Sequence, residues 1–437
     1  MSKWKFERTN NSLPEVYSSI SVTQGKNKWN KFLAFLGPGL MVAVGYMDPG
    51  NWATDIEGGA RFGYTLLSVI LISNIFAIFL QYLSLKLGIV TNRDLAQACK
   101  DHYSKPTAFI LWILAEIAIA ATDLAEVIGS AIAIHLLFGI PITIGIIITV
   151  IDVFILLLLQ NRGFRYIEAF VGGLIFIISF CFVYNLLLAQ PEIGAVLNGL
   201  IPKVDIIQNA DMLYIGIGIL GATVMPHNLY LHSSIVQTRA YGKDNISKKE
   251  AIKYATLDST ISLLLAFFIN AAILILAAAT FHKNELYEVT QIEDAYKMLE
   301  PLLGASLAPT FFAIALLAAG QNSTLTGTLS GQIVMEGFIN LKIKPWARRL
   351  ITRLIAIIPA LIVSIWMGER GTDRLLIFSQ VILSLQLSFA VIPLVLFTSD
   401  KDKMGEFANS KILTTFVWSI ALIIISFNLY MLSGFIR

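Results

Sequence analysis

The sequence predicts an all-helical polytopic membrane protein with eleven transmembrane helices. Three observations carry this prediction: an apolar composition, a series of long apolar segments, and two segments that are each interrupted at an X-Pro pair. Of the 437 residues, 56% are hydrophobic and 14% are charged, and the mean hydropathy is +0.72. A soluble domain carries about 25% charged residues. The composition therefore excludes a soluble catalytic domain, and it gives no sign of a nucleic-acid partner or an obligate protein partner.

Eleven apolar segments approach the length of about 20 residues that a helix needs to cross a bilayer. They lie near Phe32–Arg61, Tyr64–Ile89, Thr107–Phe138, Ile142–Leu159, Ile167–Ala189, Met212–Arg239, Lys253–Thr280, Pro309–Met335, Ala347–Trp366, Leu375–Phe397 and Ile412–Phe435. The first is broken at Asp48-Pro49 and the sixth at Met225-Pro226. The expected organisation is a polar tail, two five-helix repeats and an eleventh helix, at 1–31, 32–189, 212–397 and 412–435.

The polar N-terminal stretch, residues 1–31, carries charges of both signs and has no short apolar core followed by a cleavage site. It therefore predicts a retained cytoplasmic tail. With the N-terminus inside, most of the 32 Lys and Arg residues fall in the tail and the inner loops, as the positive-inside rule requires. The sequence thus predicts a multi-pass protein of the plasma membrane with a cytoplasmic N-terminus and an extracellular C-terminus.

The two broken segments resemble each other. When Gly37–Asn51 is aligned with Tyr214–Asn228, three identities appear, and Asp48 falls opposite Met225. Both stretches are rich in glycine and break at an X-Pro pair. They stand five segments apart, so the two halves have opposite orientations in the membrane. Paired broken helices in inverted repeats are a sequence signal for the midplane site of a transporter.

The first break places a carboxylate, Asp48, inside an apolar run. Such a group costs roughly 3 kcal/mol or more to insert and indicates a functional site. Broken backbone at membrane depth is tolerated where it is buried in protein or lines a cavity. Asn51 adds an amide, Pro226 frees the carbonyl of Ala222 because proline lacks an N–H, and Met225 adds a thioether. Oxygen ligands with one soft sulfur favour manganese, ferrous iron and similar ions over magnesium and calcium.

Each of these residues also has a structural interpretation. Met225 is a residue type that commonly fills gaps between helices. Asp48 can cap the second half-helix or pair with a distant arginine. Asn51 can cap a helix start, because asparagine is favoured there, and can bind metal as well.

The third segment carries three carboxylates, Glu116, Asp123 and Glu126, at spacings that place them on one helix face. Intramembrane acids in a row predict a proton relay or a water-lined path, with Arg353 of the ninth segment as a counter-charge. The alternative is a static buried ion pair. His227 and His232 follow the second break, and histidine carries protons near neutral pH, although a buried histidine can also be a packing residue.

Several amide side chains lie in other apolar segments, and three of them bear on the site. Gln380, Gln81 and Asn270 can either join helices by hydrogen bonds or face the ion. The residues alone leave both roles open. We expect Gln81 and Asn270 to lie around the site and support it.

The chain resembles the Nramp family of proton-coupled divalent metal transporters, and bacterial manganese transporters of that family in particular. The matching motifs are D-P-G-N at Asp48–Asn51, M-P-H at Met225–His227, A-T-D-L-A-E at Ala121–Glu126, K-L-G-I-V-T-N-R-D-L at Lys86–Leu95 and S-Q-V-I-L-S-L-Q-L at Ser379–Leu387. The resemblance covers the chain from Phe35 onward. One departure is Ser388, where the family often has proline.

The resemblance implies the fold of the broken-helix amino-acid transporters (LeuT-like): two inverted five-helix repeats, plus one extra helix. It implies metal binding at Asp48, Asn51, the Ala222 carbonyl and Met225, with Gln380 joining in some conformations. It associates proton passage with the positions Asp48, Asp123, Glu126, His227 and Arg353. No cofactor is implied; the metal ions and protons are cargo.

The sequence therefore predicts a proton-coupled importer of Mn²⁺, Fe²⁺ and similar ions that works by alternating access and discriminates against Mg²⁺ and Ca²⁺. A sodium-coupled amino-acid transporter of the same architecture is a rival, but its site would use half-helix N-termini and hydroxyls for a carboxylate substrate. An intramembrane enzyme is disfavoured because no H-E-x-x-H or G-x-S-x-G motif is present. A passive channel would not need two broken helices.

Overall fold

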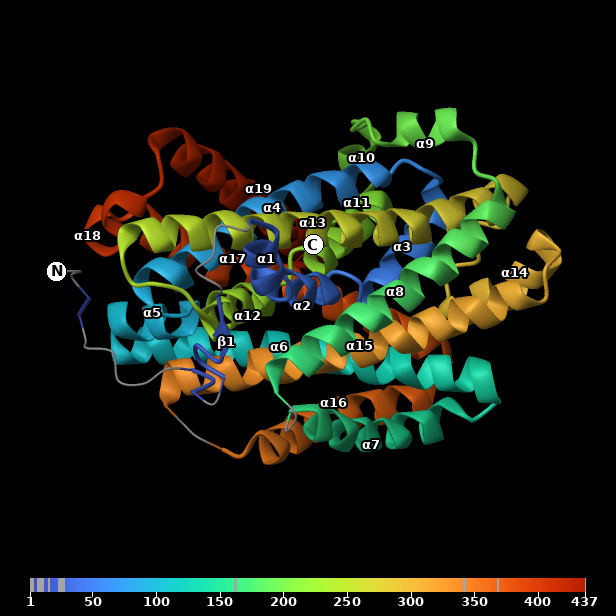
Figure 1. Cartoon of the computed structure of the whole chain (residues 1–437). Helices are drawn as coiled ribbons and strands as arrows, with labels where there is room; N and C mark the ends of the chain where they lie inside the picture. Colours follow the sequence, from blue (N-terminus) through green and yellow to red (C-terminus); the bar gives the residue numbers. More distant parts are fainter. Residues whose placement is uncertain are drawn as a thin grey trace.

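The computed structural model describes residues 4–5, 12–14, 16–22, 28–160, 163–340, 343–367 and 369–436, and these are almost entirely helical (Figure 1). The first half of the chain contains α1 (Lys28–Phe35), α2 (Pro38–Gly45), α3 (Pro49–Phe62), α4 (Leu67–Thr91), α5 (Leu95–His102), α6 (Lys105–Phe138), α7 (Ile142–Gln160), α8 (Phe164–Ala189), α9 (Ile193–Gly199) and α10 (Asp205–Gln208). The second half contains α11 (Ala210–Thr223), α12 (Pro226–Ile235), α13 (Asn245–Thr280), α14 (Ile292–Leu303), α15 (Leu307–Ile339), α16 (Pro345–Met367), α17 (Glu369–Ser399), α18 (Lys401–Met404) and α19 (Lys411–Ile436). Short 3₁₀ turns, η1 (Val236–Thr238), η2 (His282–Asn284) and η3 (Gly405–Phe407), follow α12, α13 and α18.

Every predicted apolar segment corresponds to one of these helices or to a pair of half-helices. Seven helical stretches within the described residues are long and apolar enough to cross a membrane, and Ile142–Ile151 and Leu350–Trp366 are shorter apolar helices. The protein is thus an all-helical polytopic membrane protein. The short helices α5, α9, α10 and α14 connect the long helices in the sequence, and they were not predicted.

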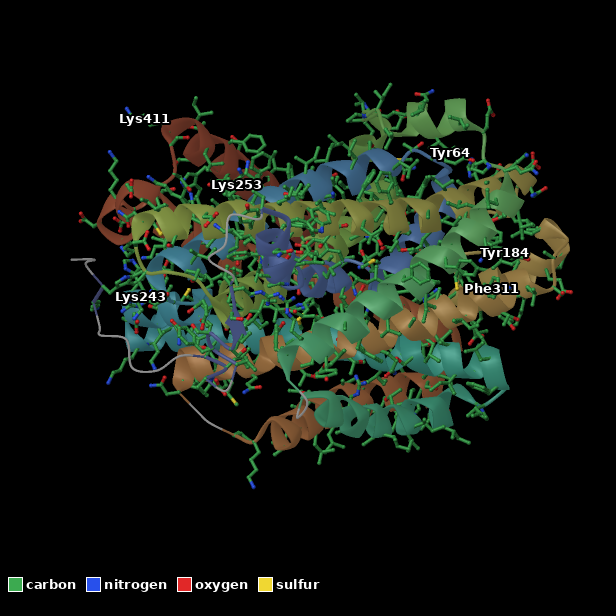
Figure 2. The ribbon with its side chains drawn as sticks, in the orientation of Figure 1. Tyr64, Tyr184, Lys243, Lys253, Phe311 and Lys411 are labelled. Carbon is green, nitrogen blue, oxygen red and sulfur yellow. The ribbon has the colours of Figure 1, made fainter. Side chains whose placement is uncertain are left out.

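The long helices run side by side between two ends of the molecule (Figure 1). α5 and α18 lie at the end where the chain begins, and α9, α10 and α14 lie at the opposite end. Figure 2 shows that the labelled lysines, Lys243, Lys253 and Lys411, gather at the first end, whereas the labelled aromatic residues, Tyr64, Tyr184 and Phe311, gather at the second. We call the end that carries these three lysines the basic end.

The two interrupted helices pass through the centre of this bundle. α2 and α3 both pack against α13, α11 packs against α17, and α12 packs against α4 and α15. Both α3 and α12 begin at a proline, which fits the first turn of a helix because its missing N–H has no partner there. The sequence breaks therefore become helix starts in the core.

Part of the N-terminal tail is attached to the basic end. Strand β1 (Ile20–Ser21) pairs in parallel with β2 (Arg239–Ala240), and the Ser12 hydroxyl donates a hydrogen bond of 2.5 Å to Asp94. α1 begins at Lys28, so it crosses the boundary expected at residue 31. Residues 1–3, 6–11, 15 and 23–27 of the expected tail, residues 1–31, lie outside the described residues.

Candidate metal site

Asp48 is the first residue of the candidate site and is fully buried. It caps α3: its Oδ1 accepts a 2.9 Å hydrogen bond from the Asn51 backbone N–H and a 2.7 Å bond from Asn51 Nδ2. Its other oxygen, Oδ2, is buried and has no hydrogen-bond partner among the described residues. A buried carboxylate oxygen without a donor is costly, and a bound cation would satisfy it.

Asn51 connects the two helix breaks. Its Nδ2 also donates to the backbone carbonyl of Ala222 at 3.3 Å. Ala222 lies at the end of α11, just before the second break. The amide N–H₂ group thus lies between an acid oxygen and a free carbonyl, where a cation would make the same contacts. Asn270 donates to Asn51 Oδ1 at 3.3 Å. Asn51 can ligate a metal only after its amide turns to present Oδ1, because an amide N–H₂ is not a ligand.

The two remaining predicted ligands come from α12 and α17. Met225 is fully buried at the start of α12 and packs with Ala118, Ala121 and Leu383. The amide of Gln380 lies against Gly50, since a Cβ on that glycine would fall 1.6 Å from Gln380 Nε2. Gln380 Oε1 is buried and has no hydrogen-bond partner among the described residues.

The donor set fits a divalent transition metal on its chemistry: one carboxylate, two amide oxygens, a carbonyl and a thioether. No cluster of three or more His, Cys, Asp or Glu residues suited to a metal occurs in the part of the chain that the structure describes. A transport site need not contain such a cluster, because a permanent metal cage would hold its cargo too firmly.

Among the predicted proton-carrying residues, His227 lies directly after the second break and contacts α6. His227 is buried, its Nδ1 is 3.3 Å from the Thr122 hydroxyl, and no described residue hydrogen-bonds to its Nε2. On α6, Asp123 and Glu126 are both fully buried. Arg353 Nη1 lies 3.5 Å from Glu126 Oε2, and both side chains are fully buried. The expected pairing of Arg353 with the acids of this helix is therefore present at Glu126.

Glu116 is different from the other two acids of α6. It is half-buried and accepts a 3.0 Å hydrogen bond from Trp112 Nε1, one turn earlier on the same helix. Asp123 and Glu126 face the interior instead.

His232 belongs to a second chain of hydrogen bonds, which includes a residue that the sequence did not single out. His232 Nδ1 is 2.9 Å from Gln81 Oε1, and Gln81 Nε2 donates to the Tyr46 hydroxyl at 2.9 Å. Asn270 donates to the Tyr46 carbonyl at 2.6 Å. Tyr46 therefore connects the first break to α4, α12 and α13. Gln81 of α4 and Asn270 of α13 thus hydrogen-bond Tyr46, which lies beside the first break.

Charged side chains also form contacts at the basic end, and these contacts were not predicted from the sequence. Arg239 is buried and donates to Glu168 at 2.6 Å and to the Leu36 carbonyl at 2.7 Å. Asp258 accepts from the backbone N–H groups of Gly37 and Gly39, at 3.3 and 2.7 Å. These contacts hold the start of α2 against α8 and α13.

The opposite end is open to a cavity of about 720 Å³. Charged side chains of both signs line it: Glu57, Arg61, Glu288, Asp294 and Arg374. α3 connects the two places: Asp48 caps its first turn, and Glu57 and Arg61 near its end line this cavity.

A bundle of long apolar helices with two central helix breaks and a buried acid between them defines a multi-pass membrane transporter. The sequence matches the family described as natural resistance-associated macrophage protein-like (Nramp) over residues 39–434, and the chain belongs to that family. It is a transporter family and not a family of enzymes.

Relatives match along nearly the whole chain. The divalent metal cation transporter MntH of Listeria innocua is 59% identical over 429 residues, which cover 98% of this chain and 96% of that protein. The protein of the same name from Bradyrhizobium diazoefficiens is 59% identical over 425 residues, or 97% of this chain and 94% of the other.

Solved structures agree with the fold. The manganese transporter of Eremococcus coleocola has a TM-score of 0.91 and 43% identity, with 97% of this chain and 91% of that one covered. Mhp1, a nucleobase-cation-symport-1 family transporter, has a TM-score of 0.60 at 14% identity over 96% of this chain and 92% of that one. The second likeness concerns the fold alone.

Proposed function

We propose that this protein imports divalent transition-metal ions, Mn²⁺ and Fe²⁺ among them, together with protons and by alternating access. The observation that carries the proposal is the buried Asp48 carboxylate at the helix break, with one oxygen lacking a donor and with the Ala222 carbonyl across from it. The names of the relatives, which are divalent metal cation and manganese transporters, support the same cargo.

In the proposed bound state the metal takes the place of the Asn51 N–H₂ group. Asp48 and the Ala222 carbonyl then contact the ion, and Asn51 turns so that Oδ1 contacts it as well. This turn breaks the 3.3 Å bond from Asn270 to Asn51. Met225 and Gln380 complete the site with a sulfur and an amide oxygen. The sulfur supports discrimination against Mg²⁺ and Ca²⁺, because these ions require oxygen ligands.

The proposed proton route uses the buried ionisable groups beside the site. Asp48 would release or take up a proton as metal binds. His227 stands two residues after Met225, and among the described residues its Nε2 has no hydrogen-bond partner. Asp123, Glu126 and Arg353 continue a buried polar path away from the metal, and His232 provides a branch through Gln81. In this proposal the metal ion and the proton take separate routes and move in the same direction.

The proposed topology has eleven spans in two inverted five-helix repeats, 32–189 and 212–397, plus a last helix at 412–435. The gathering of lysines at one end supports a cytoplasmic N-terminus by the positive-inside rule (Figure 2), and an odd number of spans makes the C-terminus extracellular. In this orientation the contacts of Arg239 and Asp258 seal the cytoplasmic side, while the charged cavity faces outward.

Flux into proteoliposomes tests the proposal. We expect an inward proton gradient to accelerate Mn²⁺ uptake, and we expect excess Mg²⁺ or Ca²⁺ to leave it nearly unchanged. Met225→Ala should let Ca²⁺ compete, whereas Met335→Ala, a buried methionine of α15 away from the breaks, should not. Equal Mn²⁺ uptake with and without the proton gradient would refute the coupling. Unchanged discrimination between Mn²⁺ and Ca²⁺ in Met225→Ala would refute the role of the sulfur.

A further inference from the structure

A second polar cavity, of about 350 Å³, opens at the basic end of the molecule, away from the candidate metal site. It lies between the last turns of α4, the first turns of α13 and the connection from η3 to α19. Its lining is Tyr82, Lys86, Lys249, Ile252, Glu406, Phe407, Ala408, Asn409, Ser410 and Leu413. None of these residues has a part in the proposed transport reaction.

Lys86 is the central feature of this cavity because its charge is buried without an acid. The residue is 3% exposed. Its ammonium donates to Asn409 Oδ1 and lies 4.9 Å from the centre of the Tyr82 ring. Asn409 is held in this orientation, since its Nδ2 donates to the hydroxyls of Thr398 and Ser399 at 3.0 and 3.2 Å. Among the described residues, no carboxylate forms an ion pair with Lys86.

An ammonium group has three N–H donors and no acceptor. One N–H of Lys86 donates to the neutral amide oxygen of Asn409, and the face of the Tyr82 ring attracts the positive charge. The side chain lines the cavity, so a remaining donor is available to a ligand there. A buried charge is stabilised best by a counter-ion, and the cavity has room for one.

The start of α19 adds to the attraction for an anion. This 26-residue helix begins at Lys411, beside the cavity, and helix N-termini present free N–H groups and a partial positive charge. The Ser410 hydroxyl accepts from the Leu413 N–H at 3.3 Å, which leaves its own proton for a ligand. Lys249 stands at the rim, where it pairs with Glu406 at 2.9 Å.

We propose that this cavity binds the phosphate group of an anionic membrane lipid, with Lys86, Ser410 and the first turn of α19 as its contacts. A phosphate fits because its oxygens accept several charge-assisted hydrogen bonds at once. The lipid source is favoured by the surroundings. Lys86 lies near the end of the apolar helix α4, and Ile412, which is 84% exposed, offers an apolar surface for an acyl chain beside the cavity.

Lipid retention by the purified full-length protein tests this proposal. Native mass spectrometry would count bound lipids after exchange into phosphatidylglycerol or phosphatidylcholine, and thermal melting would report stabilisation by each lipid and by inorganic phosphate. We expect the wild-type protein to retain phosphatidylglycerol. Lys86→Met should weaken retention about tenfold or more, the effect of losing a hydrogen bond between charged groups. Lys243→Gln, an exposed lysine at the same end but outside the cavity, should retain lipid like the wild type.

Lys249→Gln serves as a second variant, since this side chain is exposed and its loss should leave folding intact. It should weaken retention about fivefold, because a lysine near a membrane surface contributes roughly 1 kcal/mol to the binding of anionic lipid. Equal retention by the wild type, Lys86→Met and Lys249→Gln would overturn the proposal. Stabilisation by inorganic phosphate that phosphatidylglycerol does not reproduce would overturn the lipid source.

Discussion

A methyl group added at Gly50 should disturb the metal site while it favours the helix. In Gly50→Ala the new Cβ would lie 1.6 Å from Gln380 Nε2, 2.3 Å from its Cδ and 2.9 Å from its Cγ. Ordinary contact between such atoms begins near 3.5 Å, so the amide must move by about 2 Å. Alanine gains up to about 1 kcal/mol over glycine in a helix, but overpacking costs about 1–3 kcal/mol. We therefore expect a folded protein that is slightly destabilised and has the Gln380 amide displaced from its place against Gly50.

Mn²⁺ uptake and thermal melting of four proteins measure this effect: the wild type, Gly50→Ala, Gln380→Ala and the double variant. If displacement of Gln380 is the cause, Gly50→Ala and Gln380→Ala should raise the KM for Mn²⁺ to a similar extent, and the double variant should be no worse than either. The double variant should also regain the melting temperature that Gly50→Ala loses. A Gly50→Ala protein with wild-type KM, or additive losses in the double variant, would refute the reasoning.

Two further changes test the groups around the site. Glu126→Gln should destabilise the protein by about 3 kcal/mol, because it removes a carboxylate from the fully buried Arg353; melting curves would show this, and the double variant Glu126→Gln with Arg353→Met should recover most of the loss. Arg239→Ala should weaken the contacts at the basic end, which the proposed topology places on the cytoplasmic side, by about 3 kcal/mol, since it leaves the buried Glu168 with one cationic partner fewer. A cysteine placed at the buried position Val42, with Cys99 and Cys181 replaced by serine, should then react faster with a thiol reagent applied from the cytoplasmic side.

The sequence predicts the helix breaks well because proline acts locally. Pro49 and Pro226 lack the N–H that a continuous helix would use, and each is the first residue of a new helix. Pro359 and Pro393 lie inside continuous helices, so the neighbouring Asp48, Gly50 and the repeat were also needed to predict the breaks. The long apolar segments are equally local. Most of them match the helices within about four residues, but α13 begins eight residues and α17 six residues earlier than predicted. α5 and α14 were missed because short amphipathic helices have no long apolar run, and their stability comes from the helices on which they pack.

Contacts between distant residues were harder to predict. Asp258 meets Gly39, and Arg239 meets Glu168, only once α2, α8 and α13 are side by side. Tyr46 was not predicted because it is an aromatic residue in an apolar run. Nothing in the local sequence indicates that the Gln81 amide donates a hydrogen bond to its hydroxyl. The pairing of Arg353 with the α6 acids was foreseen because a buried arginine requires an acid, and the candidates were few.

The central claim is that the charge of Asp48 binds the transported metal. Asp48→Asn tests it most directly, because asparagine caps a helix start as well as aspartate does and removes only the negative charge. Uptake of Mn²⁺ into proteoliposomes would be measured for this variant and for the wild type, with melting temperature as the check on folding. We predict a folded variant with uptake no greater than that of empty liposomes; wild-type uptake by Asp48→Asn would contradict the account.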